Sequence, residues 1–143
     1  MKPEESARIK IDEQLFDAGW HIADRNHFTY DYNAIALVEA LLNGNKEADY
    51  LLFVDGKVIG VLEAKRNDID LEFAAGEQAA HYANIIPKEY PCWSEEPKVI
   101  LLANGEKILL RDSVSGEYNP ISTMPTPKKE IKIAMILPRV VTG

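Results

Sequence analysis

The chain has one cysteine, Cys92, among 143 residues, so an internal disulfide framework is excluded. Long hydrophobic runs are also missing, because the apolar stretches extend over only a few residues, far short of a membrane span. The opening residues, MKPEESARIK, are highly charged and lack the apolar segment of a signal peptide. These absences favour a reducing compartment, and we expect a cytoplasmic protein.

Basic residues are scarce as well. Sixteen Lys and Arg residues against 23 Asp and Glu residues give a formal net charge of −7. A protein that binds nucleic acid unaided usually carries a basic patch, because neutralising phosphates supplies much of its affinity. If DNA is the substrate, either local basic residues face it or another domain holds it, and the second is the more economical explanation.

The length and patterning predict a single α/β domain over residues 1–143, with a core over 1–112 and a polar, Pro-rich extension over 113–143. Helices are expected at 3–18, where Gly19 provides a stop, and at 72–86, which Pro87 closes. Residues 34–42 suggest either a shorter helix or a poorly defined excursion. The expected apolar stripe of the first helix is Ile9, Leu15 and Phe16, with Ala7, Ile11 and Ala18 alongside.

Two hairpins are expected between and after these helices. In the first, two apolar runs flank Asp55-Gly56, and the run from Lys57 to Lys65 is apolar enough on both faces to lie centrally. In the second, KVILLAN and EKILLRD flank Asn104-Gly105. The elements together predict a central mixed β-sheet flanked by helices.

Glu63 and Lys65 lie two apart on the predicted central strand, so their side chains leave the same face. A carboxylate and an ammonium at the end of a buried strand are costly without a partner or a purpose. A metal explains the arrangement, since Asp49 and Glu63 offer the hard oxygen ligands that Mg²⁺ prefers. Lys65 would then position a water or stabilise developing negative charge on a phosphate.

The turn of the first hairpin decides whether Asp49 reaches this site. A two-residue turn at Asp55-Gly56 places Asp49 opposite Leu62, on the wrong face. A three-residue loop, residues 54–56, with Gly56 left-handed in a G1 bulge would place Asp49 diagonal to Glu63, on its face. The single-site hypothesis therefore requires the bulged hairpin, or a comparable kink near Asp49.

Spacing alone favours an ordinary strand-end pair, with Asp49 a solvated residue at the start of a strand. The apolar hairpin that carries all three residues shifts the balance toward a site, and so does the helix that follows. In that helix, Gln78 and Tyr82 lie at i and i+4 and share a face. They either pack side by side or aim at the site, where they would contact nucleic acid or support the catalytic lysine, and the sequence favours neither interpretation.

The stretch DYLLFVDGKVIGVLEAKR from Asp49, followed by Gln78-Ala-Ala-His-Tyr82, resembles the N-terminal nuclease domain of type I restriction enzyme R subunits. That family belongs to the PD-(D/E)xK nuclease superfamily and has a restriction-endonuclease-like core. The opening SARIKIDEQLFDAGW is also similar to the first helix of the family. The resemblance covers residues 4 to about 86, and the second hairpin continues it. One departure is Ala48, which stands where the superfamily's name has proline.

The resemblance implies roles for individual residues. Asp49 and Glu63 match the metal-binding acids, Lys65 matches the catalytic lysine, and Gln78 and Tyr82 match a Gln-x-x-x-Tyr element associated with nuclease activity. It also implies that the backbone carbonyl of Ala64 ligates the metal. An early acid sometimes joins such sites, which leaves Glu4 and Glu5 both open.

The family further implies a Mg²⁺-dependent endonuclease that cuts double-stranded DNA with methyltransferase and specificity subunits. ATP would act only through a translocase domain, and no P-loop motif occurs in these residues. We therefore expect an excised domain or truncated protein whose C-terminal extension leads toward that translocase. The alternatives are a stand-alone or repair nuclease of the same superfamily and a catalytically silent module that docks partners.

Overall fold

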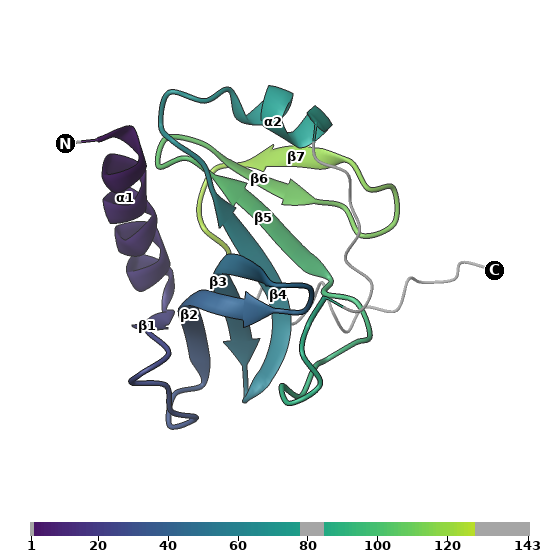
Figure 1. Cartoon of the computed structure of the whole chain (residues 1–143). Helices are drawn as coiled ribbons and strands as arrows, with labels where there is room; N and C mark the ends of the chain where they lie inside the picture. Colours follow the sequence, from purple (N-terminus) through teal and green to yellow (C-terminus); the bar gives the residue numbers. More distant parts are fainter. Residues whose placement is uncertain (1, 78–84, 128–143) are drawn as a thin grey trace.

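The computed structural model describes residues 2–77 and 85–127, and every structural statement below concerns these residues (Figure 1). The elements in chain order are α1 (Pro3–Ala18), β1 (His21–Ala23), β2 (Ala34–Leu42), β3 (Lys46–Val54), β4 (Lys57–Ala64), α2 (Leu71–Glu77), β5 (Val99–Ala103), β6 (Ile108–Arg111) and β7 (Tyr118–Ile121).

One mixed sheet contains the seven described strands, and every strand lies beside its neighbours in the sequence. β1 pairs parallel with β2 and β4 pairs parallel with β5, while the other adjacent pairs are antiparallel. β4 is therefore an interior strand, with β3 on one side and β5 on the other. The predicted α/β class, a central mixed sheet flanked by helices, is confirmed.

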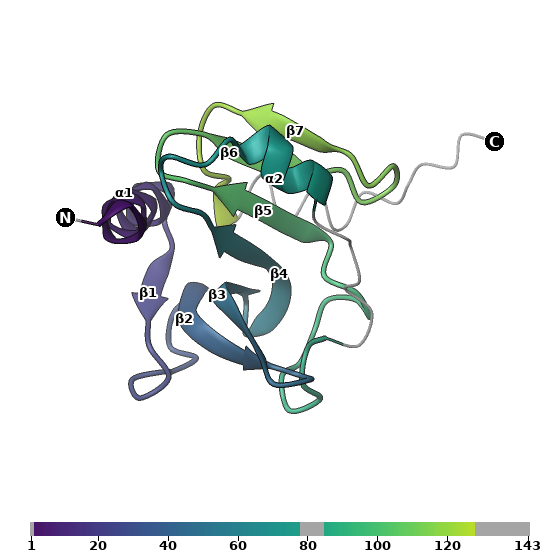
Figure 2. The ribbon, with the colours of Figure 1, turned by 45° about the horizontal axis from the view of Figure 1, so that its top comes forward.

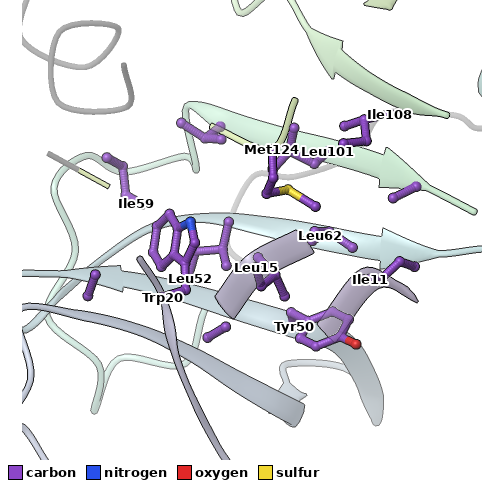
Figure 3. Close-up of a cluster of buried hydrophobic side chains, with 14 of the residues drawn as sticks. Ile11, Leu15, Trp20, Tyr50, Leu52, Ile59, Leu62, Leu101, Ile108 and Met124 are labelled. Carbon is purple, nitrogen blue, oxygen red and sulfur yellow. The ribbon is translucent and has the colours of Figure 1, made fainter. Parts of the chain in front are cut away.

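α1 covers one face of the sheet through Ala7, Ile11 and Leu15, which are almost fully buried. Ile11 and Leu15 belong to a cluster with Tyr50 and Leu62 (Figure 3). Ile9 and Phe16, expected in the buried stripe, are instead 47% and 73% exposed, so that part of the prediction was wrong. Gly19 ends the helix with a left-handed φ of 105°, as its position in the sequence indicates.

α2 lies over β5 and β6 (Figure 2). Its Leu71 packs against Leu102 and Leu109, whereas Leu101 packs in the cluster that α1 covers. Successive strand residues point to opposite faces, so the two helices cover opposite faces of the sheet. Neither described helix is long and apolar enough to cross a membrane.

Residues 34–42 form strand β2, so the helix suggested there was wrong. Ile35 and Leu37 pack in a cluster on one face, while Ala34 and Ala36 pack in the cluster under α1. A continuous apolar run suits an interior strand buried on both faces, and such a run has no clear period that would distinguish it from a helix.

The helix predicted at 72–86 is confirmed over residues 72–77, which belong to α2 (Leu71–Glu77), and is wrong at Ile85 and Ile86, which are not helical. Residues 78–84 lie outside the described part of the chain. The carbonyl oxygens of Ile85 and Ile86 accept hydrogen bonds from the backbone and side chain of Asn43 at 2.9 and 3.3 Å. In addition, Pro87 disfavours helical backbone at the residue before it.

The second hairpin is confirmed, since β5 and β6 pair antiparallel across Asn104-Gly105. The sheet and the core continue past residue 112, where we expected the core to end. β7 pairs with β6, Met124 is 4% exposed, and the indole of Trp20 donates to the carbonyl oxygen of Pro125 at 2.9 Å. The outermost position of β7 accommodates Pro120, because a strand at a sheet edge tolerates a missing N–H.

Candidate active site

The turn of the β3–β4 hairpin has two residues. Asp55 and Gly56 both have positive φ, 51° and 80°, and Val54 pairs with Lys57 across them. This geometry is typical of the turns whose twist matches that of the flanking strands. The three-residue loop that we expected, with a G1 bulge at Gly56, is therefore wrong.

The irregularity that the site requires lies further along β4. Phe53 pairs with Val58 but Leu52 pairs with Gly60, so Ile59 is an extra residue in β4. Beyond this bulge the register shifts by one, and Tyr50 pairs with Leu62. Continuing that register would bring Asp49 level with Glu63. An irregularity comparable to the required kink is thus present, in the strand opposite Leu52 and Phe53 and not in the turn.

The Asp49 carboxylate hydrogen-bonds to β4 just beyond the last backbone pair of β3 and β4. Its Oδ2 accepts the backbone N–H of Ala64 at 2.7 Å. Its Oδ1 accepts a hydrogen bond from Nη2 of Arg8 on α1 at 2.8 Å. Asp49 therefore joins the end of β4 to the first helix, and both of its oxygens are engaged.

Glu63 is half-buried beside Asp49. Burial raises the pKa of Glu63, the negative charge of Asp49 raises it further, and the positive charges of Lys65 and Arg8 offset only part of the shift. Among the described residues, no hydrogen bond or ion pair satisfies the Glu63 carboxylate. The charged form of Glu63 is therefore destabilised in the folded protein, which is the condition that a bound cation relieves.

A cavity of about 280 Å³ opens at the end of β4, between α1 and the segment that leads to α2. It is lined by Glu4, Arg8, Asp49, Ala64, Lys65, Arg66 and Ile69. The backbone N–H of Lys65 donates to the carbonyl oxygen of Ala103 on β5 at 2.8 Å, and the side chain of Asn67 donates to Ser6 on α1 at 3.1 Å. These bonds hold the walls of the cavity together.

The donor set around this cavity fits a hard divalent cation. Within the described ranges, no three His, Cys, Asp or Glu side chains are grouped to hold a metal. Mg²⁺ does not need such a group, because it keeps several waters and commonly binds only one or two carboxylates. The carboxylates of Asp49 and Glu63 and the backbone carbonyl of Ala64 are oxygen ligands of this kind. Asp49 and Ala64 line the cavity, and Glu63 precedes Ala64 on β4 without lining it. The unpartnered Glu63 carboxylate is the observation that favours the fit.

Of the remaining expected site residues, the structure describes Glu4 and Glu5 but not Gln78 and Tyr82. Glu4 and Glu5 are both exposed on α1, but Glu4 lines the cavity together with Lys65 and Glu5 does not. Gln78 and Tyr82 lie outside the described residues, so their side chains remain predictions.

A family model described as the second domain of the type I restriction enzyme EcoKI endonuclease subunit matches residues 30–107, just over half of the chain. The chain belongs to this family. The matched range of this restriction endonuclease subunit domain includes β2, β3, β4 and β5, and with them Asp49, Glu63 and Lys65. The expected resemblance to type I R subunits is thereby confirmed.

A solved structure supports the fold of this restriction endonuclease subunit domain. It is described as a fragment of an HsdR subunit of a type I restriction enzyme from Vibrio vulnificus YJ016, and it is similar with a TM-score of 0.57 at 18% identity. The similarity covers 92% of this chain and 25% of the HsdR chain, so this chain spans about a quarter of that structure's length. No curated protein matches the chain.

Sequence reasoning missed Arg8 as part of the site in this restriction endonuclease subunit domain. Arg8 follows the buried Ala7 and lies four residues after Glu4, so a signal existed. An arginine next to the buried stripe of a helix needs an acidic partner, because an unpaired buried charge is costly. The sequence could not indicate which of 23 acids that partner would be.

Replacing Glu63 with glutamine is expected to stabilise the metal-free domain and to raise its Tm by about 2–4 °C. Glutamine keeps the size of the side chain and removes the charge that burial and Asp49 disfavour. Calorimetry in the presence of EDTA measures the shift. Glu95→Gln is the control, because it removes the same charge from an exposed position. An unchanged or lower Tm in Glu63→Gln would contradict the repulsion argued above.

Proposed function

We propose that this domain is the metal-dependent endonuclease of a type I restriction–modification complex and that it hydrolyses phosphodiester bonds of double-stranded DNA. The observation that carries the proposal is the bulge at Ile59, because the register beyond it, continued past Tyr50 and Leu62, would bring Asp49 level with Glu63. Asp49 and Lys65 also line one cavity. Membership in a restriction endonuclease subunit family supports phosphodiester hydrolysis as the chemistry.

In the proposed mechanism Asp49, Glu63 and the carbonyl of Ala64 would hold Mg²⁺, which supplies Lewis-acid activation of a water and neutralises phosphate charge. Lys65 lines the same cavity and would donate hydrogen bonds to the attacking water or to the phosphate oxygen on which charge develops. The N–H of Ala64 fixes Oδ2 of Asp49, and Oδ1, which accepts a hydrogen bond from Arg8, would face the metal. Gln78 and Tyr82 remain proposed supporting residues.

The partners are part of the proposal. The net charge of −7 argues that this domain does not hold DNA alone. We therefore assign DNA binding to a translocase domain of the same polypeptide, which would use ATP, and to methyltransferase and specificity subunits. The specificity subunit would select the sequence, and cleavage would follow translocation.

Metal binding is the most direct test. Mg²⁺ or Mn²⁺ at about a hundred times its Kd is expected to add about 3 kcal/mol to the free energy of unfolding, because only the folded site binds it. Asp49→Asn should lose this increment, and Glu95→Asn, at an exposed position away from the cavity, should keep it. Urea unfolding with and without metal measures both.

A catalytically silent docking module is the second candidate, and one observation favours it. Arg8 already neutralises the charge of the Asp49 carboxylate without a metal, as a purely structural ion pair would. The metal titration separates the two candidates, since a silent module gains no stability from Mg²⁺ or Mn²⁺. If the free energy of unfolding of the wild-type protein does not change when Mg²⁺ or Mn²⁺ is added, the nuclease proposal is overturned.

A further inference from the structure

Arg8 binds the same carboxylate that is proposed to bind the metal. Its Nη2 lies 2.8 Å from Oδ1 of Asp49, and the two side chains are only 30% and 29% exposed. The pair joins α1 to β3 across 41 residues of sequence. A half-buried ion pair of this kind is less screened by solvent than a surface pair, so it contributes more to the position of both groups.

Neighbouring side chains fix the guanidinium in this place. Its carbon lies 5.2 Å from the centre of the Tyr50 ring, within the range of a cation–π contact. The hydroxyl of Tyr50 in turn donates to Asp12, one helical turn after Arg8 on α1. Arg8 is therefore held by a ring and a carboxylate at once, on a rigid helix.

This arrangement conflicts with metal binding at Asp49. Oδ2 accepts the N–H of Ala64, so Oδ1, which Arg8 occupies, is the oxygen left for a cation. A divalent cation bound to Oδ1 would lie close to the positively charged guanidinium, because Nη2 of Arg8 is 2.8 Å from the same oxygen. The two cations repel each other at this distance, so they compete for this oxygen.

We propose that Arg8 is an internal competitor for the metal: its guanidinium holds Asp49 in the metal-free protein and must leave Oδ1 when a divalent cation binds. This inference rests on the proposed function and adds a step that precedes it. The displaced guanidinium stays in the cavity that it lines with Lys65 and Arg66, where a DNA phosphate is its natural alternative partner.

A purely structural role for Arg8 predicts the opposite change in metal affinity when Arg8 is removed. If Arg8 only held Asp49 in a geometry suited to the metal, its removal would weaken metal binding. If Arg8 competes, its removal strengthens metal binding. The direction of the change in Kd therefore distinguishes the two roles without any measurement of cleavage.

Isothermal titration of Mn²⁺ into the whole chain, without DNA, measures the change. Arg8→Ala is expected to lower the Kd about five- to tenfold, the factor that corresponds to a partly buried ion pair. Arg66→Ala is the matched control, because Arg66 lines the same cavity but pairs with Asp68 and not with Asp49. It should change the Kd less than twofold.

Arg8→Met is the second variant, since its unbranched chain still covers the Tyr50 ring if the alanine variant does not fold. If an Arg8 variant binds Mn²⁺ with the same Kd as wild type, or with a higher one, the competition is overturned. The proposed function still stands in that case, provided that the wild-type protein binds Mn²⁺. An equal gain in Arg66→Ala also overturns the competition, because charge alone would then explain the effect. Absence of Mn²⁺ binding in wild type and all variants overturns both proposals together.

Discussion

Lys65→Ala is expected to reduce DNA cleavage by the assembled restriction complex about a hundred- to a thousandfold. Lys65 lines the cavity beside Asp49, and its ammonium is the group there proposed to stabilise charge on the phosphate. Its side chain has no hydrogen-bond or ion-pair partner within the described residues, so its removal should leave the fold intact. The measurement is Mg²⁺-dependent cleavage of plasmid DNA by the full-length subunit assembled with its partners.

The control variant lies at the other end of the same strand. Lys57 stacks its ammonium over the Trp93 ring, 5.1 Å from its centre, and does not line the cavity. Lys57→Ala removes the same charge and should cleave within about threefold of wild type, in keeping with a surface substitution. Wild-type cleavage by purified Lys65→Ala protein would exclude Lys65 from the chemistry.

Gly60→Ala is expected to lower the free energy of unfolding by about 4 kcal/mol, a large part of the stability of a domain this size. A Cβ at position 60 would lie 1.9 Å from the carbonyl oxygen of Val99, where β4 pairs parallel with β5. Because that oxygen belongs to the backbone of an interior strand, the clash can be relieved only by moving one strand away from the other. Urea denaturation measures the loss.

Gly44→Ala is the matched control for this substitution. Gly44 has a φ of 76°, and no atom lies within 4 Å of a Cβ built there, so alanine adds backbone strain but no clash. It should cost about 1 kcal/mol. If Gly60→Ala cost no more than Gly44→Ala, the close approach of β4 and β5 would be refuted, and with it the packing that fixes the end of β4.

The parts of the fold with a regular local signal could be predicted from the sequence. Residues 3–18 combine an early proline, acids in the first turn and a terminal glycine, and they form α1. Asp55-Gly56 between apolar runs gave a hairpin because positive φ is easy for those two residues. The apolar character of Lys57 to Lys65 correctly indicated an interior strand.

The parts that failed depend on contacts between distant segments. Residues 34–42 became a strand because β1 and β3 were available to pair with both of its edges. The bulge at Ile59 has no marker of its own, since the neighbouring Gly60 is explained by Val99 and not by a positive φ. The pairing of Arg8 with Asp49 spans 41 residues, and spacing carries no information at that range.

The hairpin that carries the bulge also bears on the order in which the site assembles. Asp49 and Glu63 are brought together by a two-residue turn, and hairpins form within about 1–10 μs. Arg8 and the parallel neighbour β5 must close much longer loops, the latter across residues 65–98, and long loops close later. We therefore expect the two acids to come together before Arg8 pairs with Asp49, so that their repulsion slows folding as well as lowering the final stability.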